Sequence, residues 1–239
     1  LGEGYRLIAS SDFPAETRAA LVSIAAKGHR TLCIGQGAEL EWSRSPRPLG
    51  IDEILEIFKR KTAPAFEVAL HLGAVAAGAP ENVLKVLSEY SEKLGIAYQI
   101  RDDLADAGQA ARAGADGEAI MPSIVPAAAW RRAKGLPRDH EERRRIRSLW
   151  AESPEALSRR ELQQLFERFD APAEVRGMLA EYKAAAVAAL TSLDEAGLKV
   201  LLRRLLARIF GDDEESDWCA DHEATDAPGD APRGPADRW

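Results

Sequence analysis

Cysteines, aromatic residues and long apolar runs are all scarce in this sequence of 239 residues. The two cysteines, Cys33 and Cys219, lie in different settings, which argues against a disulfide framework and favours a reducing, cytoplasmic location. Charged residues interrupt every apolar stretch, so we expect no membrane-spanning segment. Aromatic residues make up only 6% of the chain and β-branched runs are rare, which favours helices over strands.

The charge of the chain is spread unevenly. Residues 211–239 hold ten Asp/Glu and two Arg, a net charge of -8, so the total of -7 leaves about +1 for residues 1–210. A nucleic-acid partner needs a concentrated basic face, and we expect none. The residues after 210 are also rich in proline and glycine and have no apolar periodicity, which predicts an acidic disordered tail. Whether this tail is a solubilising extension or a docking segment stays open.

Apolar residues recur at helical spacing along nearly the whole chain, and strand-like alternation is almost absent. The two prolines and the glycine within residues 43–50 predict a loop. We therefore predict an all-α domain over residues 1–210, followed by the tail at 211–239. Helices are expected at residues 13–40, 52–60, 61–77, 80–106, 123–134, 141–150, 158–169, 173–193 and 196–210.

Three aspartates, Asp102, Asp103 and Asp106, stand near the end of the predicted helix 80–106. Asp102 and Asp106 are four residues apart, so their carboxylates share one face of the helix and repel each other. Mg²⁺ would offset this repulsion, because it takes one or two carboxylates and completes its shell with water and substrate phosphate oxygens. A solvated acidic helix end is the competing interpretation of such a motif in isolation.

Other polar residues precede the aspartates. Gln99 lies one turn before Asp103 and can hydrogen-bond a diphosphate or a metal-binding carboxylate. Lys61 and Thr62 stand at the head of another predicted helix, where an ammonium group and exposed backbone amides favour an anion. Polar and small residues of an earlier apolar stretch complete the series: Gly35, Gln36 and Glu39.

In this order and spacing the motifs resemble the trans-isoprenyl diphosphate synthase, or polyprenyl synthetase, family. The resemblance is collinear over residues 1–126 and is most specific at the second aspartate-rich motif, Tyr98-Gln99-Ile100-Arg101-Asp102-Asp103-Leu104-Ala105-Asp106. It implies an antiparallel all-α helical bundle of the isoprenoid synthase type around a deep cavity. The N-terminal helices of that bundle would be missing from this chain, so residues 1–210 would form a partial domain.

The resemblance implies a prenyltransferase of isoprenoid biosynthesis, which condenses an allylic prenyl diphosphate with isopentenyl diphosphate. Asp102, Asp103 and Asp106 would hold Mg²⁺ ions that bridge the allylic diphosphate, and the ions would stabilise its departing charge. The resulting cation would be attacked by the double bond of isopentenyl diphosphate, after which a proton would be lost.

Further roles follow from the same resemblance. Lys61, Thr62 and Gln99 would form the diphosphate-binding site, and the expected catalytic residues are Lys61, Gln99 and Asp102. In this family the region that corresponds to the first long helix pairs two subunits, so we expect a homodimer. The apolar stripe for this contact consists of Leu21, Ile24, Ala25, Leu32 and Cys33.

Departures from the family pattern keep other functions open. The first aspartate-rich motif and the upstream basic residues that bind isopentenyl diphosphate do not occur in this chain, so we expect the chain alone to be inactive. Glu118 stands where the family has a lysine, and Arg101 or Arg112 could compensate for it. One alternative is therefore a catalytically weakened homologue that acts as a regulatory or partner-binding subunit. A second is a terpene cyclase of the same fold, although the second metal motif of that class is not evident after Asp106.

Overall fold

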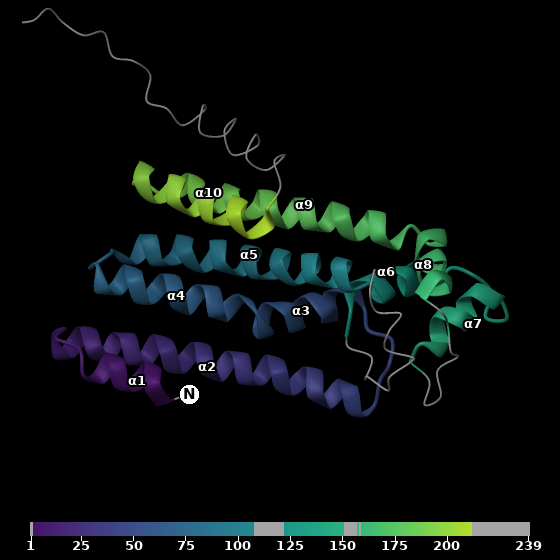
Figure 1. The fold of residues 1–239 in the computed structure, drawn as a ribbon, viewed down its shortest axis with the longest axis horizontal. Coiled ribbons are helices and arrows are strands. Elements are labelled where there is room, and N and C mark those ends of the chain that lie inside the picture. Colours follow the sequence, from purple (N-terminus) through teal and green to yellow (C-terminus); the bar gives the residue numbers. More distant parts are fainter. Residues whose placement is uncertain (1, 108–121, 151–156, 158, 212–239) are drawn as a thin grey trace, which may run out of the picture. The chain divides into compact units, whose positions relative to one another are not determined.

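The computed structural model describes residues 2–107, 122–150, 157 and 159–211. Every regular element in these ranges is a helix, as Figure 1 shows. The prediction of an all-α fold is therefore confirmed. The helices are α1 (Gly2–Ala9), α2 (Ala15–Arg44), α3 (Ile51–Lys61), α4 (Ala63–Ala76), α5 (Glu81–Ala107), α6 (Ile124–Ala133), α7 (Glu141–Ser148), α8 (Arg159–Arg168), α9 (Ala171–Ala189) and α10 (Ala196–Phe210).

The chain divides into two units, Leu1–Ser192 and Leu193–Trp239. The first contains α1 to α9 and the short 3-10 turn Leu190–Ser192, and the second contains α10. The predicted domain over residues 1–210 spans the first unit and α10, and it stays a prediction. Apart from Gly211, the predicted acidic tail lies outside the described residues, as do Arg112 and Glu118.

Four long helices of the first unit run side by side with alternating direction: α2, α4, α5 and α9 (Figure 1). Helix α5 packs against both α4 and α9, and α2 packs against α3 and α4. Helices α3 and α4 follow one another directly, separated only at Thr62. The predicted site residues lie at this α3–α4 junction and at the C-terminal end of α5.

Two glycines allow neighbouring helices to approach the α3–α4 junction closely. A Cβ atom at Gly35 of α2 would stand 2.6 Å from the backbone nitrogen of Lys61. A Cβ atom at Gly95 of α5 would stand 2.4 Å from the Cα atom of Ala63. Both separations are far below a van der Waals contact, and the opposing atoms belong to the backbone, so a larger residue would push the helices apart. Glycine at these two positions therefore brings α2 and α5 against the junction.

Local signals account for the ends of the helices around the site. Pro46 and Pro48 follow α2 and prevent the helix from continuing. The Glu53 side chain then accepts a hydrogen bond from the backbone N–H of Gly50 at 2.8 Å, which satisfies an amide at the start of α3. Pro64 lies in the first turn of α4, where its missing N–H has no helical partner to lose.

The main apolar core lies among α3, α5, α6 and α9, and it holds the C-terminal part of α5 in place. Its fully buried side chains include Ile54, Phe58, Ile96, Ile100, Ile124 and Val175. None of the described helices combines the length and the apolar character that crossing a bilayer requires.

Candidate functional site

A buried ion pair joins α2 to the end of α3. Lys61 Nζ donates to Glu39 Oε1 at 2.6 Å, and Gln36 Nε2 donates to Glu39 Oε2 at 2.7 Å. The side chain of Glu39 is only 4% exposed, whereas that of Lys61 is 27% exposed. A carboxylate this deeply buried requires such partners, because an uncompensated buried charge is strongly unfavourable. The ammonium group of Lys61 is thereby held at the α3–α4 junction, with part of its side chain open to solvent.

The next residue, Thr62, connects the junction to α5. Its hydroxyl donates to Gln99 Oε1 at 2.9 Å. Gln99 also hydrogen-bonds the side chain of Asp103, one turn further along α5. Since an ionised carboxylate only accepts, the amide NH₂ of Gln99 faces Asp103 and its oxygen faces Thr62. Thr62, Gln99 and Asp103 therefore form one polar chain that crosses from the α3–α4 junction to α5.

Asp103 is the buried member of the aspartate motif. Its Oδ2 accepts a hydrogen bond from the backbone N–H of Ile124 at 2.8 Å. Burial raises the pKa of Asp103 to about 6, although its hydrogen bonds from Ile124, Ser123 and Gln99 act in the opposite direction. Ile124 is the first residue of α6, and Ser123 makes no side-chain cap bond to that helix. The Asp103 carboxylate therefore caps α6 from a different helix.

Asp102 and Asp106 have different surroundings. The side chain of Asp102 is 36% exposed, and Asp106 is exposed as well. Because they are four residues apart, their carboxylates lie on one face of α5. Arg101 Nη2 donates to Asp102 Oδ1 at 2.8 Å, and the guanidinium carbon of Arg101 lies 4.5 Å from the centre of the Tyr98 ring.

Two of the three aspartates offer a donor set that suits Mg²⁺. Among the residues that the structure describes, no three His, Cys, Asp or Glu side chains gather around a common point that could hold a metal. Asp102 and Asp106 are accessible carboxylates, and Mg²⁺ commonly takes one or two of these and keeps several waters. Asp103 would first have to release the N–H of Ile124. The accessible pair therefore fits the ion, and Asp103 in this conformation does not.

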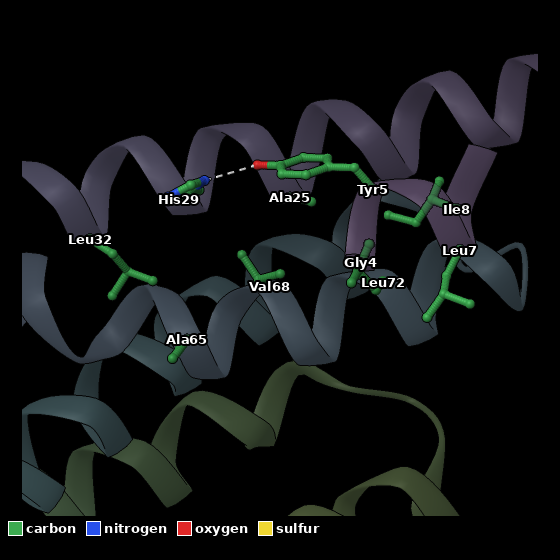
Figure 2. Close-up of a pocket in the computed structure, with 10 residues that line it drawn as sticks. All are labelled: Gly4, Tyr5, Leu7, Ile8, Ala25, His29, Leu32, Ala65, Val68 and Leu72. Carbon is green, nitrogen blue, oxygen red and sulfur yellow. Dashed lines mark hydrogen bonds between the residues drawn. The ribbon is translucent and has the colours of Figure 1, made fainter. Parts of the chain in front are cut away.

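An apolar cavity of about 530 Å³ lies between α1, α2 and α4 (Figure 2). Ala65, Val68 and Leu72 form its α4 wall, and they follow one face of that helix at spacings of three and four residues. At the α1–α2 side, the Tyr5 hydroxyl and His29 Nδ1 are 3.2 Å apart, as the dashed line in Figure 2 marks. The wall begins three residues after Thr62 and continues for about 10 Å along α4.

The structure connects some of the predicted site residues directly and gives others partners of their own. Thr62, Gln99 and Asp103 form one chain of hydrogen bonds, whereas Lys61 pairs with Glu39 and Asp102 pairs with Arg101. Sequence reasoning did not foresee the link between Asp103 and the start of α6. A serine at the first position of a predicted helix, here Ser123, is a common N-cap signal and could have directed attention there.

Comparison with known proteins tests the family assignment. The family model described as polyprenyl synthetase matches residues 2–168, which is more than half of the chain. The chain belongs to the polyprenyl synthetase family. The resemblance carried by the second aspartate-rich motif is therefore confirmed, and the matched region contains every predicted site residue.

Curated relatives of this family member include two farnesyl diphosphate synthases. The one from Bacillus subtilis (strain 168) is 36% identical over 111 residues, which cover 44% of this chain and 37% of the relative. The one from Escherichia coli (strain K12) is 30% identical over 135 residues, which cover 51% of this chain and 44% of the relative. This chain thus aligns with less than half the length of each of these relatives.

Solved structures show the same fold. The geranylgeranyl pyrophosphate synthetase from Pyrococcus horikoshii superposes with a TM-score of 0.73 at 21% identity, over 87% of this chain and 63% of that chain. The geranylgeranyl pyrophosphate synthase from Corynebacterium glutamicum, complexed with isoprenyl diphosphate and magnesium, gives a TM-score of 0.69 at 23% identity, over 83% and 57% of the two chains. The polyprenyl synthetase family member described here therefore has the helical fold of these enzymes.

Proposed function

We propose that the complete protein is a prenyltransferase that condenses an allylic prenyl diphosphate with isopentenyl diphosphate. The observation that carries this proposal is a polar corner, formed by Glu39, Lys61, Thr62 and Gln99, that lies one helical turn along the chain from the apolar cavity wall. Lys61 and Thr62 precede α4 at the polar corner, and the cavity wall begins one turn later at Ala65. A prenyl diphosphate has the same two parts, an anionic head and an apolar chain.

The head group would bind at the polar corner. Among the residues that the structure describes, the Lys61 ammonium group donates one hydrogen bond, to Glu39. An ammonium group has three donors, so two would be available for phosphate oxygens. Thr62 and Gln99 would support the site by holding α4 and α5 together. The Corynebacterium glutamicum relative that was solved with isoprenyl diphosphate and magnesium supports this choice of ligands.

Asp102 and Asp106 would hold Mg²⁺, which we propose as the cofactor. When bound, the ion would stabilise negative charge on the diphosphate as a Lewis acid. Asp103, the third predicted ligand, is engaged with the start of α6, and we assign it the role of anchoring α6 to the metal-binding end of α5.

Lys61 and the apolar wall on α4 would each contribute to the reaction. The bond between the allylic carbon and the diphosphate oxygen breaks, and its electron pair leaves with the diphosphate, whose charge Lys61 would help to neutralise. The apolar wall formed by Ala65, Val68 and Leu72 would keep water from the allylic cation. The double bond of isopentenyl diphosphate then forms the new carbon–carbon bond, and a proton is lost.

The predicted homodimer is part of the proposal. Of the predicted stripe, Leu21 is buried within the chain, and Ala25 and Leu32 line the cavity. Cys33 of the stripe is exposed, and Leu40, exposed at 57%, lies two turns further along the same face of α2, so these side chains offer a surface for a second copy. The molar mass in solution tests this part, and a monomer at micromolar concentration would contradict it.

Thermal unfolding with farnesyl diphosphate and Mg²⁺ tests the ligand site on this chain. A ligand that binds only the native state raises the unfolding midpoint by mass action, by about 5–10 °C at one hundred times the dissociation constant. We expect a shift that requires both farnesyl diphosphate and Mg²⁺ and is lost in Asp102→Asn.

Lys93→Met is the matched control, because it removes a charge from the same helix at a distance from the proposed ligands. This variant should keep the full shift. No shift of the unaltered chain under any combination would contradict the metal–diphosphate site, and it would favour the alternative of a partner-binding or regulatory subunit.

A further inference from the structure

Arg101 occupies the carboxylate that we assign to the metal. Its Nη2 and Nε donate to Asp102 Oδ1 at 2.8 Å and 3.2 Å, so two donors converge on one oxygen. Asp102 and Asp106, one turn apart, repel each other, and the guanidinium group offsets this repulsion. An arginine stays charged at any physiological pH. The metal-free chain therefore already carries a permanent cation on one of the two carboxylates that we assign to the metal.

The guanidinium group rests on an aromatic platform that reaches across two helices. Its central carbon lies 4.5 Å from the centre of the Tyr98 ring, and that ring packs against Phe66 of α4 with 5.7 Å between centroids. Stacking on an aromatic face stabilises an arginine without using its N–H donors. If the contact with Asp102 is broken, the Tyr98 ring therefore still holds the Arg101 guanidinium group, and Tyr98 directly precedes Gln99 of the proposed diphosphate site.

A divalent ion that binds Asp102 Oδ1 meets the guanidinium group on the same oxygen, and the two positive charges repel each other. The pair is only half-buried, with side-chain exposures of 32% for Arg101 and 36% for Asp102, so water can replace either partner and the pair is weak enough to exchange. Once the ion has taken the oxygen, the donors that held Asp102 would lie near the ion, whose shell the phosphate oxygens of the substrate complete. The planar guanidinium fork matches phosphate geometry.

We propose that Arg101 is an exchangeable counter-ion of Asp102. It holds the carboxylate when no divalent ion is bound, leaves it when the ion enters, and then donates to the diphosphate head of the substrate. This role rests on the proposed function of the site, and it makes Arg101 a binding residue for diphosphate in addition to Lys61. Substitution of Arg101 should therefore strengthen metal binding and weaken diphosphate binding.

The first arm of the test measures the metal alone. Mn²⁺ replaces Mg²⁺, and the electron paramagnetic resonance signal of free Mn²⁺ reports its binding to the complete chain without diphosphate. Arg101→Met should bind Mn²⁺ about three- to tenfold more tightly than the unaltered chain, because the competing cation is gone. Arg101→Lys keeps the charge but loses the planar fork, and it should fall between the two.

Lys93→Met is a closely matched control for this arm. Lys93 and Glu92 are also neighbours on α5 and form an ion pair at 2.9 Å with side-chain exposures of 35% and 30%. Removing Lys93 should leave the Mn²⁺ affinity unchanged. Equal or weaker Mn²⁺ binding by Arg101→Met, or equal gains in both Met variants, would overturn the counter-ion role. Circular dichroism shows whether each variant is folded. If Arg101→Met is unfolded, Arg101→Lys still tests the role, because it should bind Mn²⁺ more tightly than the unaltered chain does.

The second arm measures inorganic diphosphate by isothermal titration calorimetry at saturating Mg²⁺. Arg101→Met should bind diphosphate about five- to twentyfold more weakly, since a charge-assisted contact is lost. Unchanged affinity would overturn the diphosphate role. If the unaltered chain itself binds no diphosphate with Mg²⁺, the proposed function fails, whereas the Mn²⁺ arm still decides whether Arg101 competes for Asp102.

Discussion

The two ion pairs of the site, Lys61–Glu39 and Arg101–Asp102, have similar lengths but different surroundings. Their shortest nitrogen–oxygen distances are 2.6 Å and 2.8 Å. The Glu39 side chain is 4% exposed and both of its oxygens accept hydrogen bonds, whereas the Asp102 side chain is 36% exposed. The two ion pairs therefore cannot be distinguished by their lengths. They are distinguished by how far water can reach the carboxylate.

Burial of the carboxylate distinguishes a structural ion pair from an exchangeable one. If Lys61 left Glu39, a buried carboxylate would lose its counter-charge with little water to replace it. If Arg101 left Asp102, water or a metal ion could take its place at modest free-energy change. We therefore expect Lys61 to contact a diphosphate while it remains paired with Glu39, and Arg101 to exchange partners.

The largest expected effect comes from breaking the enclosed pair. Lys61→Met should lower the free energy of unfolding by about 3–5 kcal/mol, because it leaves the Glu39 carboxylate buried without its counter-charge. Urea denaturation of the chain without ligands measures this loss. Arg101→Met should change the same quantity by less than about 1 kcal/mol.

A double variant identifies the cause of that loss. Glu39→Gln combined with Lys61→Met removes both charges and should recover most of the stability, since a buried pair can be replaced by uncharged groups at little loss. Equal instability of the single and double variants would show that packing of the Lys61 side chain, and not the charge of Glu39, stabilises the corner.

The next largest effect is expected from the close contact between α2 and the end of α3, which positions the Lys61–Glu39 ion pair. Gly35→Ala should lower the free energy of unfolding by about 1–3 kcal/mol, because its Cβ would stand 2.6 Å from backbone atoms at the end of α3. Gly37→Ala is the matched control two residues along the same helix, with no atom within 4 Å of its Cβ. It should raise stability by up to about 1 kcal/mol through helix propensity. Denaturation curves that show a similar change for both variants would contradict a tight contact at Gly35.

Helix positions could be predicted from the sequence wherever apolar periodicity and helix-ending residues agree. The expected helix at 80–106 is α5 (Glu81–Ala107), and the expected helix at 196–210 is α10 with the same bounds. Helix α2 was expected to end at residue 40 but continues to Arg44. Glu41, Ser43 and Arg44 show no apolar periodicity, and the helix ends only where Pro46 approaches.

The candidate site could be predicted as a set of residues but not as a set of contacts. Lys61, Thr62, Gln99 and the aspartates were expected from their order and spacing, and the structure places all of them in the first unit. Their partners depend on which helices meet. Neighbouring residues of a helix point about 100° apart, so Asp103 can face the start of α6 and be buried while Asp102 stays half-exposed.

The last prediction uses these two adjacent carboxylates. Asp103→Ala should lower the free energy of unfolding by about 1–2 kcal/mol, because the N–H of Ile124 at the start of α6 loses its acceptor. Asp103→Asn keeps an acceptor oxygen and should lose much less. Asp102→Ala, one position away and half-exposed, should stay within about 0.5 kcal/mol of the unaltered chain. Urea denaturation without metal compares the three variants, and hydrogen exchange at Ile124 reports the cap directly. Slower exchange in the unaltered chain and in Asp103→Asn than in Asp103→Ala would locate the loss at the start of α6. Equal exchange in all variants would mean that Asp103 is not its cap, and Asp103 would then be available as a third metal ligand.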